Sequence, residues 1–171
     1  MIAALSALVV LACMGAFDTI VYHEVVARLP WTPAAWSELR LHALRDFVYG
    51  VLIASLAWLE PHGWLILPLV LLLATEIAIT LSDFLVEDRT RKLPAGERSM
   101  HAVMGITYGI FVALLFPQAV GWAQAPTGFA AASYGWLSWI LTAFALGVVS
   151  SGVRDYLASR ALRHKEPARS A

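Results

Sequence analysis

Long apolar runs alternate with short polar segments along this chain, and five of the runs are long enough to cross a membrane. A hydrocarbon core of about 30 Å requires about 20 helical residues. The predicted spans are residues 2–26, 35–59, 64–88, 97–117 and 134–158. Segments with proline or glycine separate them, and Pro117 is expected to end the fourth. The pattern predicts an all-α integral membrane protein with one transmembrane domain of five helices, residues 1–158.

The composition fits that class. Of the 171 residues, 60% are hydrophobic, and residues 102–153 carry no charged side chain. The formal net charge of zero gives no basic face for a nucleic acid. The single cysteine, Cys13, excludes an internal disulfide and any metal site built from several thiolates. Residues 1–17 lack the basic start of a signal peptide, so we expect them to remain as the first helix.

The basic residues predict the orientation. All 12 lie near the first and third turns or after the fifth span: Arg28, Arg40, Arg45, Arg89, Arg91, Lys92, Arg98, Arg154, Arg160, Arg163, Lys165 and Arg169. Basic residues favour the cytoplasmic side of a membrane. We therefore expect a multi-pass protein of the inner (plasma) membrane, with its N-terminus outside and a cytoplasmic basic tail at residues 159–171.

A polar signature at the first turn recurs at the third. The first copy has His23-Glu24, Arg28-Leu29-Pro30, Glu38, His42 and Tyr49-Gly50; the second has Glu87-Asp88, Lys92-Leu93-Pro94, Glu97, His101 and Tyr108-Gly109. In both copies the histidine follows a glutamate by four residues and precedes Tyr-Gly by seven. This predicts two parallel hairpin repeats, about residues 13–60 and 77–118. Together they would form a four-helix bundle, with the fifth helix, about 134–158, outside it.

The repeated polar residues are candidate metal ligands, because residues four apart lie on one face of a helix. The predicted ligands are His23, Glu24, Glu38, His42, Glu87, Glu97 and His101. Oxygen and imidazole donors without thiolate suit iron, manganese or zinc. Ordinary ion pairs near the lipid headgroups are an alternative for Glu38 and Glu97. Duplication of a purely structural hairpin would also preserve the spacing.

The order of donors along the helices resembles that of the ferritin-like di-iron carboxylate proteins. In those proteins two helices each supply a glutamate and two supply a Glu-x-x-His pair. Here glutamate and histidine are four residues apart instead of three, and His23-Glu24 stands where a lone glutamate is expected. The resemblance concerns donor order alone, and it implies a di-iron centre.

Four further residues are predicted to act in catalysis. Glu76 lies near the middle of the third span, where a carboxylate is costly unless it is paired, protonated or hydrated. Asp83 follows it by seven residues on the same face and would continue a polar path to the cytoplasmic end. A protonated Glu76 bonded to a neighbouring hydroxyl is an equal alternative. Tyr49 and Tyr108 lie two turns deeper than the histidines and could bond ligands or relay electrons.

Four functions are compatible with these features. The first is a membrane oxidoreductase with a metal centre, in our view di-iron, that acts on a lipophilic substrate such as a quinone or lipid. The second is a b-type haem protein with His42 and His101 as axial ligands. The third is a cation or proton transporter that uses Glu76 and Asp83 and forms a homodimer. The fourth is a non-catalytic subunit of a larger complex in the lipid bilayer.

Overall fold

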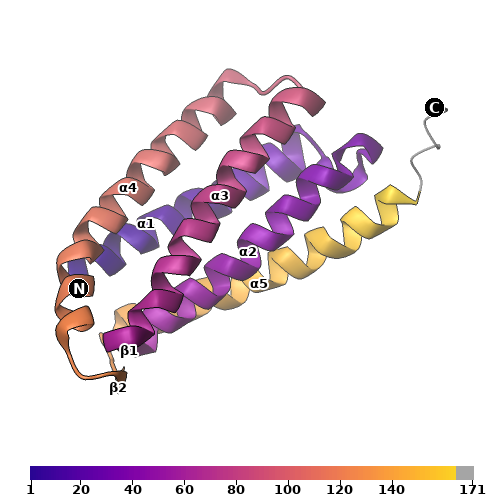
Figure 1. Cartoon of the computed structure of the whole chain (residues 1–171). Helices are drawn as coiled ribbons and strands as arrows, with labels where there is room; N and C mark the ends of the chain where they lie inside the picture. The colour runs from indigo at the N-terminus through magenta and orange to yellow at the C-terminus, as the bar shows by residue number, and fades with distance from the viewer. Residues whose placement is uncertain (165–171) are drawn as a thin grey trace.

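The computed structural model describes residues 1–164 and is almost entirely helical (Figure 1). Its long helices are α1 (Ile2–Asp18), α2 (Trp36–Trp58), α3 (Ile66–Thr90), α4 (Ala95–Gln124) and α5 (Trp136–Arg163). A π-helix, η1 (Thr19–Val26), continues α1, and three short 3-10 turns, η2 (Leu29–Trp31), η3 (Pro33–Ala35) and η4 (Gly63–Leu65), lie in the connections. Within the described residues, five helices are long and apolar enough to cross a membrane. This supports the predicted all-α membrane protein; residues 165–171 of the predicted tail lie outside the described part.

The prediction that Pro117 ends the fourth helix was wrong. Pro117 lies inside α4, which continues to Gln124. Proline removes one backbone donor, but the residues that follow it, 118–124, contain no second proline and include the apolar Ala119, Val120 and Trp122. At membrane depth a helix is the arrangement that keeps their remaining backbone groups paired.

The helix pairs that pack closely are not those of the two predicted hairpins, α1 with α2 and α3 with α4. α1 packs mainly on α4, and α2 packs on α3 and along the length of α5 (Figure 1). Consecutive helices, α1 with α2 and α3 with α4, touch much less. Leu5 and Leu8 of α1, Leu52 of α2, and Phe111 and Leu115 of α4 belong to the fully buried core between these helices.

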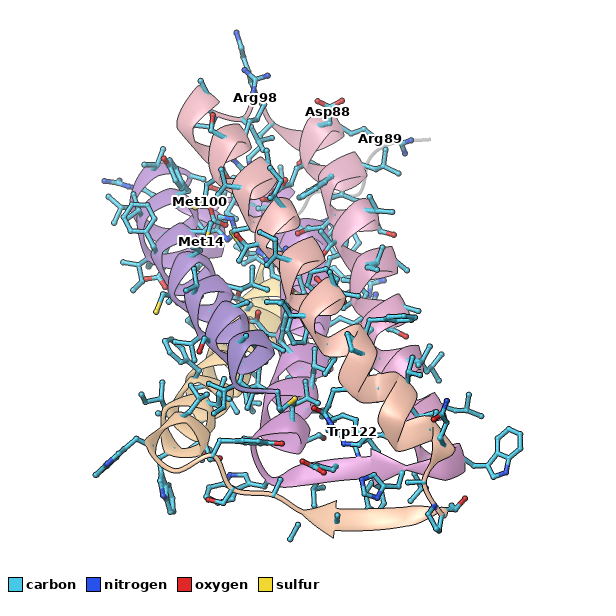
Figure 2. All side chains as sticks on the ribbon, turned by 90° about the vertical axis from the view of Figure 1, so that its left-hand side faces the viewer. Met14, Asp88, Arg89, Arg98, Met100 and Trp122 are labelled. Atoms are coloured by element: carbon cyan, nitrogen blue, oxygen red, sulfur yellow. The ribbon has the colours of Figure 1, made fainter. Side chains whose placement is uncertain are left out.

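One end of the bundle is closed by a small sheet that the sequence did not predict. β1 (Leu59–His62) and β2 (Gly128–Ala131) pair antiparallel where α2 meets α3 and α4 meets α5 (Figure 1). Glu60 accepts hydrogen bonds from Trp122 Nε1 at 3.2 Å and from the Tyr134 hydroxyl at 2.8 Å. Burial, together with the Glu60 carboxylate, raises the pKa of Tyr134. Figure 2 shows Trp122 towards this end and Asp88, Arg89 and Arg98 at the opposite end.

Glycines allow α5 to lie close against α2. A Cβ on Gly152 would stand 3.0 Å from the Asp46 Cβ and 3.2 Å from the Ala43 carbonyl oxygen. A Cβ on Gly50 would collide with the Val149 side chain, whereas one on Gly109 of α4 would meet nothing within 4 Å. Gly50 and Gly109 occupy equivalent positions on α2 and α4, since each follows a histidine by eight residues. Their surroundings differ because α5 packs on α2 and not on α4.

We therefore expect Gly50→Leu to destabilise the protein and Gly109→Leu to leave it unchanged or slightly stabilised. Overpacking costs about 1–3 kcal/mol, whereas replacing an exposed helical glycine gains helix propensity. Thermal unfolding in detergent would measure both variants. Equal melting temperatures would contradict the close α2–α5 packing.

Candidate metal centre

The π-helix at the end of α1 brings two polar side chains onto the same face. Asp18 and His23 are five residues apart, a spacing that separates side chains on an α-helix. Hydrogen bonds in a π-helix join residues five apart, so η1 aligns the two. The Asp18 Oδ2 atom lies 3.2 Å from the His23 Nε2 atom. Both side chains are buried, at 2% and 3% exposure.

Three other helices supply pairs of residues four apart. The pairs are Glu38 with His42 on α2, Asp83 with Glu87 on α3, and Glu97 with His101 on α4. We call these six side chains, together with Asp18 and His23, the histidine–carboxylate cluster. Seven of the eight are buried, and the His101 side chain is 10% exposed.

Donor atoms from different helices converge in this cluster. The His101 Nε2 atom is 3.3 Å from Asp18 Oδ2, and the His42 Nε2 atom is 3.0 Å from Asp83 Oδ2. His23 Nε2 lies 3.6 Å from Glu97 Oε1, and the rings of His23 and His42 stack with centroids 4.4 Å apart.

Two subsets of the cluster bring one donor atom per residue within 4.8 Å of one another: His23, Glu87, Glu97 and His101, and Glu38, His42 and Glu87. Glu87 belongs to both subsets. The arrangement therefore has two adjacent groups of donors with a shared carboxylate.

Several of these atoms lack the hydrogen bonds that buried polar atoms normally make. In residues 1–164 the buried side-chain atoms without a partner are Asp18 Oδ1, His23 Nε2, His42 Nε2, Asp83 Oδ1 and Glu87 Oε2. All five belong to the cluster. The imidazole nitrogens stand close to carboxylate oxygens but not in hydrogen-bonding geometry. Since an unmade buried hydrogen bond costs about 1–3 kcal/mol, five at one place point to a missing bonding partner.

Two arginines contact carboxylates of the cluster. Arg91, between α3 and α4, donates to Glu38 at 2.8 Å and to Glu97 at 2.8 Å, and it also reaches Glu87 at 3.4 Å. Burial alone would lower the pKa of Arg91, but hydrogen bonds and charge from Glu97 and Glu38 outweigh it and raise that pKa. Arg45 of α2 donates to Asp83 at 3.0 Å.

The charges of the cluster do not balance when its histidines are neutral. It has five carboxylates, and Arg45 and Arg91 supply two positive charges among the described residues in contact with them. Three negative charges would remain in a buried site within apolar helices, where unpaired charge is costly. Protons or metal cations must supply the difference.

The structure brings six of the seven predicted metal ligands together. His23, Glu38, His42, Glu87, Glu97 and His101 all belong to the cluster. Glu24 does not; its carboxylate pairs instead with Arg154 of α5. Because Glu24 follows His23 directly, it points away from the direction in which His23 points.

The four predicted catalytic residues divide into two groups. Asp83 lies within the cluster itself, against His42. Tyr49, Glu76 and Tyr108 line a cavity of about 240 Å³, which His101 and Arg45 also line. Glu76 accepts a hydrogen bond from Thr80 Oγ1 at 2.7 Å, and the Tyr108 hydroxyl donates to the Leu73 carbonyl at 3.1 Å. The hydroxyl that bonds Glu76 is therefore on its own helix, whereas the alternative placed it on a neighbouring helix.

The sequence did not predict Asp18 or Arg91 as members of the site. Asp18 lies on the face of His23 only because η1 is a π-helix, which no residue pattern indicated. Arg91 was assigned only to the basic side of the membrane. Arg91 lies three residues before Pro94, just after the end of α3. This position could have indicated its role, because a side chain in a connection can reach carboxylates on more than one helix.

No family model matches this chain, and no curated protein and no solved structure matches it either.

We expect Arg91→Met to destabilise the protein in the presence of a chelator. Breaking a buried ion pair costs about 3–5 kcal/mol, since it leaves carboxylates without a counter-charge. The neighbouring and exposed Lys92 gives the control, and Lys92→Met should change the free energy of unfolding by no more than about 0.5 kcal/mol. Chemical unfolding in mixed micelles measures both. Similar values for the two variants would show that Arg91 does not hold the cluster together.

Proposed function

We propose that this chain is a membrane oxidoreductase with a two-metal centre, iron being the favoured metal, that acts on a lipophilic substrate. The observation that carries the proposal is the convergence of three histidines and five carboxylates from four helices, with five buried atoms left without a partner. The analogy with di-iron carboxylate proteins in donor order supports iron.

The distances between donors fit metal coordination. With metal–ligand bonds of 2.0–2.2 Å, neighbouring donors around one ion stand about 3.0–3.4 Å apart. Asp18 Oδ2 lies 3.2 Å from His23 Nε2 and 3.3 Å from His101 Nε2. The donors are oxygen and imidazole nitrogen, which suit iron, manganese or zinc. Two divalent cations would supply four positive charges, one more than the three negative charges that the arginines leave.

A pseudo-two-fold relation between the hairpins supports two related half-sites. His101 contacts Asp18 at 3.3 Å, and the corresponding His42 contacts Asp83 at 3.0 Å. The packing of α1 on α4 likewise corresponds to that of α3 on α2. The π-helix compensates for one additional residue, since Asp18 and His23 are five apart where Asp83 and Glu87 are four apart. Parallel repeats in a four-helix bundle, with α5 outside, account for these correspondences.

The remaining residues would position the ligands. A pair of iron or manganese ions would supply one-electron chemistry when bound. Arg91 orients Glu38 and Glu97 through direct hydrogen bonds, and Arg45 does the same for Asp83. Such partners of ligating carboxylates set both their orientation and their basicity. Glu76 and the two tyrosines beside it offer a path for protons between the membrane interior and His101.

A b-type haem fits these side chains less well. The His23 ring stacks on His42 at 4.4 Å and lies edge-on to His101 at 6.3 Å, so it occupies the space beside both proposed axial ligands. The surrounding carboxylates add negative charge that a bis-histidine haem does not require. We therefore favour metal ions over haem.

The centre belongs on the cytoplasmic side if the basic residues indicate the orientation correctly. Asp88, Arg89 and Arg98 lie at the end of the bundle opposite the strands (Figure 2). In a Cys13→Ser background, a cysteine at Arg89 should resist a membrane-impermeant maleimide in intact cells. A cysteine at Phe129, a residue of β2 that is 62% exposed, should react. The opposite labelling pattern would show that the protein has the inverse orientation in the membrane.

Metal analysis of detergent-purified protein tests the proposed centre. We expect about two ions per chain and no haem absorption, as in other two-metal sites. His42→Ala and His101→Ala should each lose at least one ion, because each removes a nitrogen donor of one half-site. His62→Ala is the matched control, since His62 lies in β1 at the other end of the bundle and should retain both ions.

Folded wild-type protein without metal would reject the centre and leave transport through Glu76 and Asp83, or a structural role in a complex. Equal metal content in all three variants would place the ions elsewhere.

A further inference from the structure

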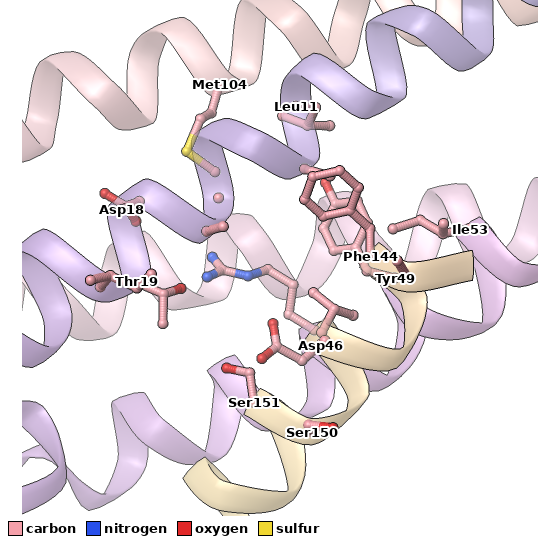
Figure 3. A pocket seen from close by; sticks show the side chains of 18 of the residues that line it. Leu11, Asp18, Thr19, Asp46, Tyr49, Ile53, Met104, Phe144, Ser150 and Ser151 are labelled. Carbon is pink, nitrogen blue, oxygen red and sulfur yellow. The ribbon is translucent and has the colours of Figure 1, made fainter. Parts of the chain in front are cut away.

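A cavity of about 550 Å³ lies between α1, α2 and α5, beside the cluster (Figure 3). It occupies the place where α1 and α2 make little contact with each other. Its lining is apolar at one end, with Leu8, Ile53 and Phe144, and polar at the other, with Asp46 and Ser151. Its volume falls within the range of about 300–1,000 Å³ that ligand pockets occupy.

The cavity is accessible from the membrane. Gly147 and Ser150 of α5 line it and are also exposed at the protein surface. They lie within the segment of α5 that is apolar enough to span a membrane. The opening between α1 and α5 therefore faces lipid, and a molecule dissolved in the bilayer can reach it laterally.

The two arginines at the polar end, Arg45 and Arg154, are already paired with carboxylates. Arg154 bonds to Asp155 at 2.9 Å and also pairs with Glu24. Arg45 bonds to Asp83 at 3.0 Å. This leaves no cation for an anionic headgroup. The Thr19 hydroxyl lies on the wall, while Ser150 donates to the Leu146 carbonyl at 2.8 Å and Ser151 accepts from Arg154 at 3.5 Å, so these two keep oxygen atoms that can still accept a hydrogen bond. The lining favours a neutral head with hydrogen-bonding oxygen atoms and an apolar tail.

The polar end of the cavity reaches the cluster through Asp18. This residue lines the cavity, while its Oδ2 atom stands 3.2 Å from His23 and 3.3 Å from His101. Its Oδ1 atom is buried and has no hydrogen-bond partner. Figure 3 shows Asp18 and Tyr49 on the cavity wall, with Asp46 and Ser151 nearby. A head bound at this end would lie one side chain away from the histidines.

We propose that this cavity binds the substrate, and that the substrate is a neutral, quinone-class molecule that enters from the bilayer with its ring towards Asp18. The apolar end, at Leu8 and Ile53, holds the start of its tail. The assignment as substrate rests on the proposed oxidoreductase function; the binding itself does not.

Gly147→Leu tests the site, because a Cβ on Gly147 meets nothing within 4 Å and the added side chain can enter the cavity without a clash. Gly109→Leu makes the same exchange at an open position that does not line the cavity. The probe is a decyl-substituted benzoquinone, titrated into detergent-solubilised protein. We expect Gly147→Leu to weaken binding by at least about tenfold and Gly109→Leu to leave it within about twofold.

The same titration has outcomes that overturn the proposal. Equal affinity in the two variants would place the quinone elsewhere or in the micelle. The neutral character of the ligand would be overturned if a single-chain phosphate lipid bound more tightly than the quinone and lost its affinity in Gly147→Leu. A benzoquinone with a diazirine on its tail should label α1, α2, α5 or Met104 of α4 in the wild-type protein, and labelling of α3 alone would reject the site.

Metal content measured in the same preparations separates the two proposals. Full metal content with unchanged quinone binding in Gly147→Leu would reject the cavity and leave the metal centre intact. Metal-free protein that loses quinone binding in Gly147→Leu would support the binding site and reject the oxidoreductase.

Discussion

Five carboxylates buried within apolar helices are the constraint on which the rest of this structure depends. Each would cost several kcal/mol in the membrane without a counter-charge. Arg45 and Arg91 compensate only part of that charge, although Arg91 alone contacts Glu38, Glu87 and Glu97. Three histidines stand among the same oxygen atoms with two of their nitrogens unbonded. Metal cations bonded to both kinds of donor would satisfy the charge and the missing hydrogen bonds together.

The packing of the helices follows from gathering these groups at one end. α1 packs on α4 and α2 on α3, which brings one donor-bearing segment from each helix to a common position. The weakly packed pairs, α1 with α2 and α3 with α4, leave cavities of about 550 Å³ and 240 Å³ on the two sides of Arg45 and Tyr49. α5 packs on only one side of the bundle, along α2, and so gives the larger cavity a polar wall.

Much of this arrangement could be predicted from the sequence, for physical reasons. Apolar length indicated the five spans, and the spacing of four placed Glu38 with His42 and Glu97 with His101 on common helix faces. The unpredicted parts depend on tertiary structure. The π-helix at Thr19–Val26 brings Asp18 and His23 together although they are five residues apart, and Arg91 reaches carboxylates of three helices from a connection. The Glu24 carboxylate could serve as a metal ligand, but its side chain points away from the cluster. This is because Glu24 directly follows His23, whose side chain points into the cluster.

We propose that two metal ions lie side by side among these histidines and carboxylates. Metal-edge X-ray absorption spectroscopy on purified, metal-loaded protein tests it most directly. We predict a first shell of nitrogen and oxygen at about 2.0–2.2 Å, with no sulfur, and a second metal at about 3.5–4 Å. A folded protein that binds no metal, or whose bound ion has no metal neighbour, would contradict the claim.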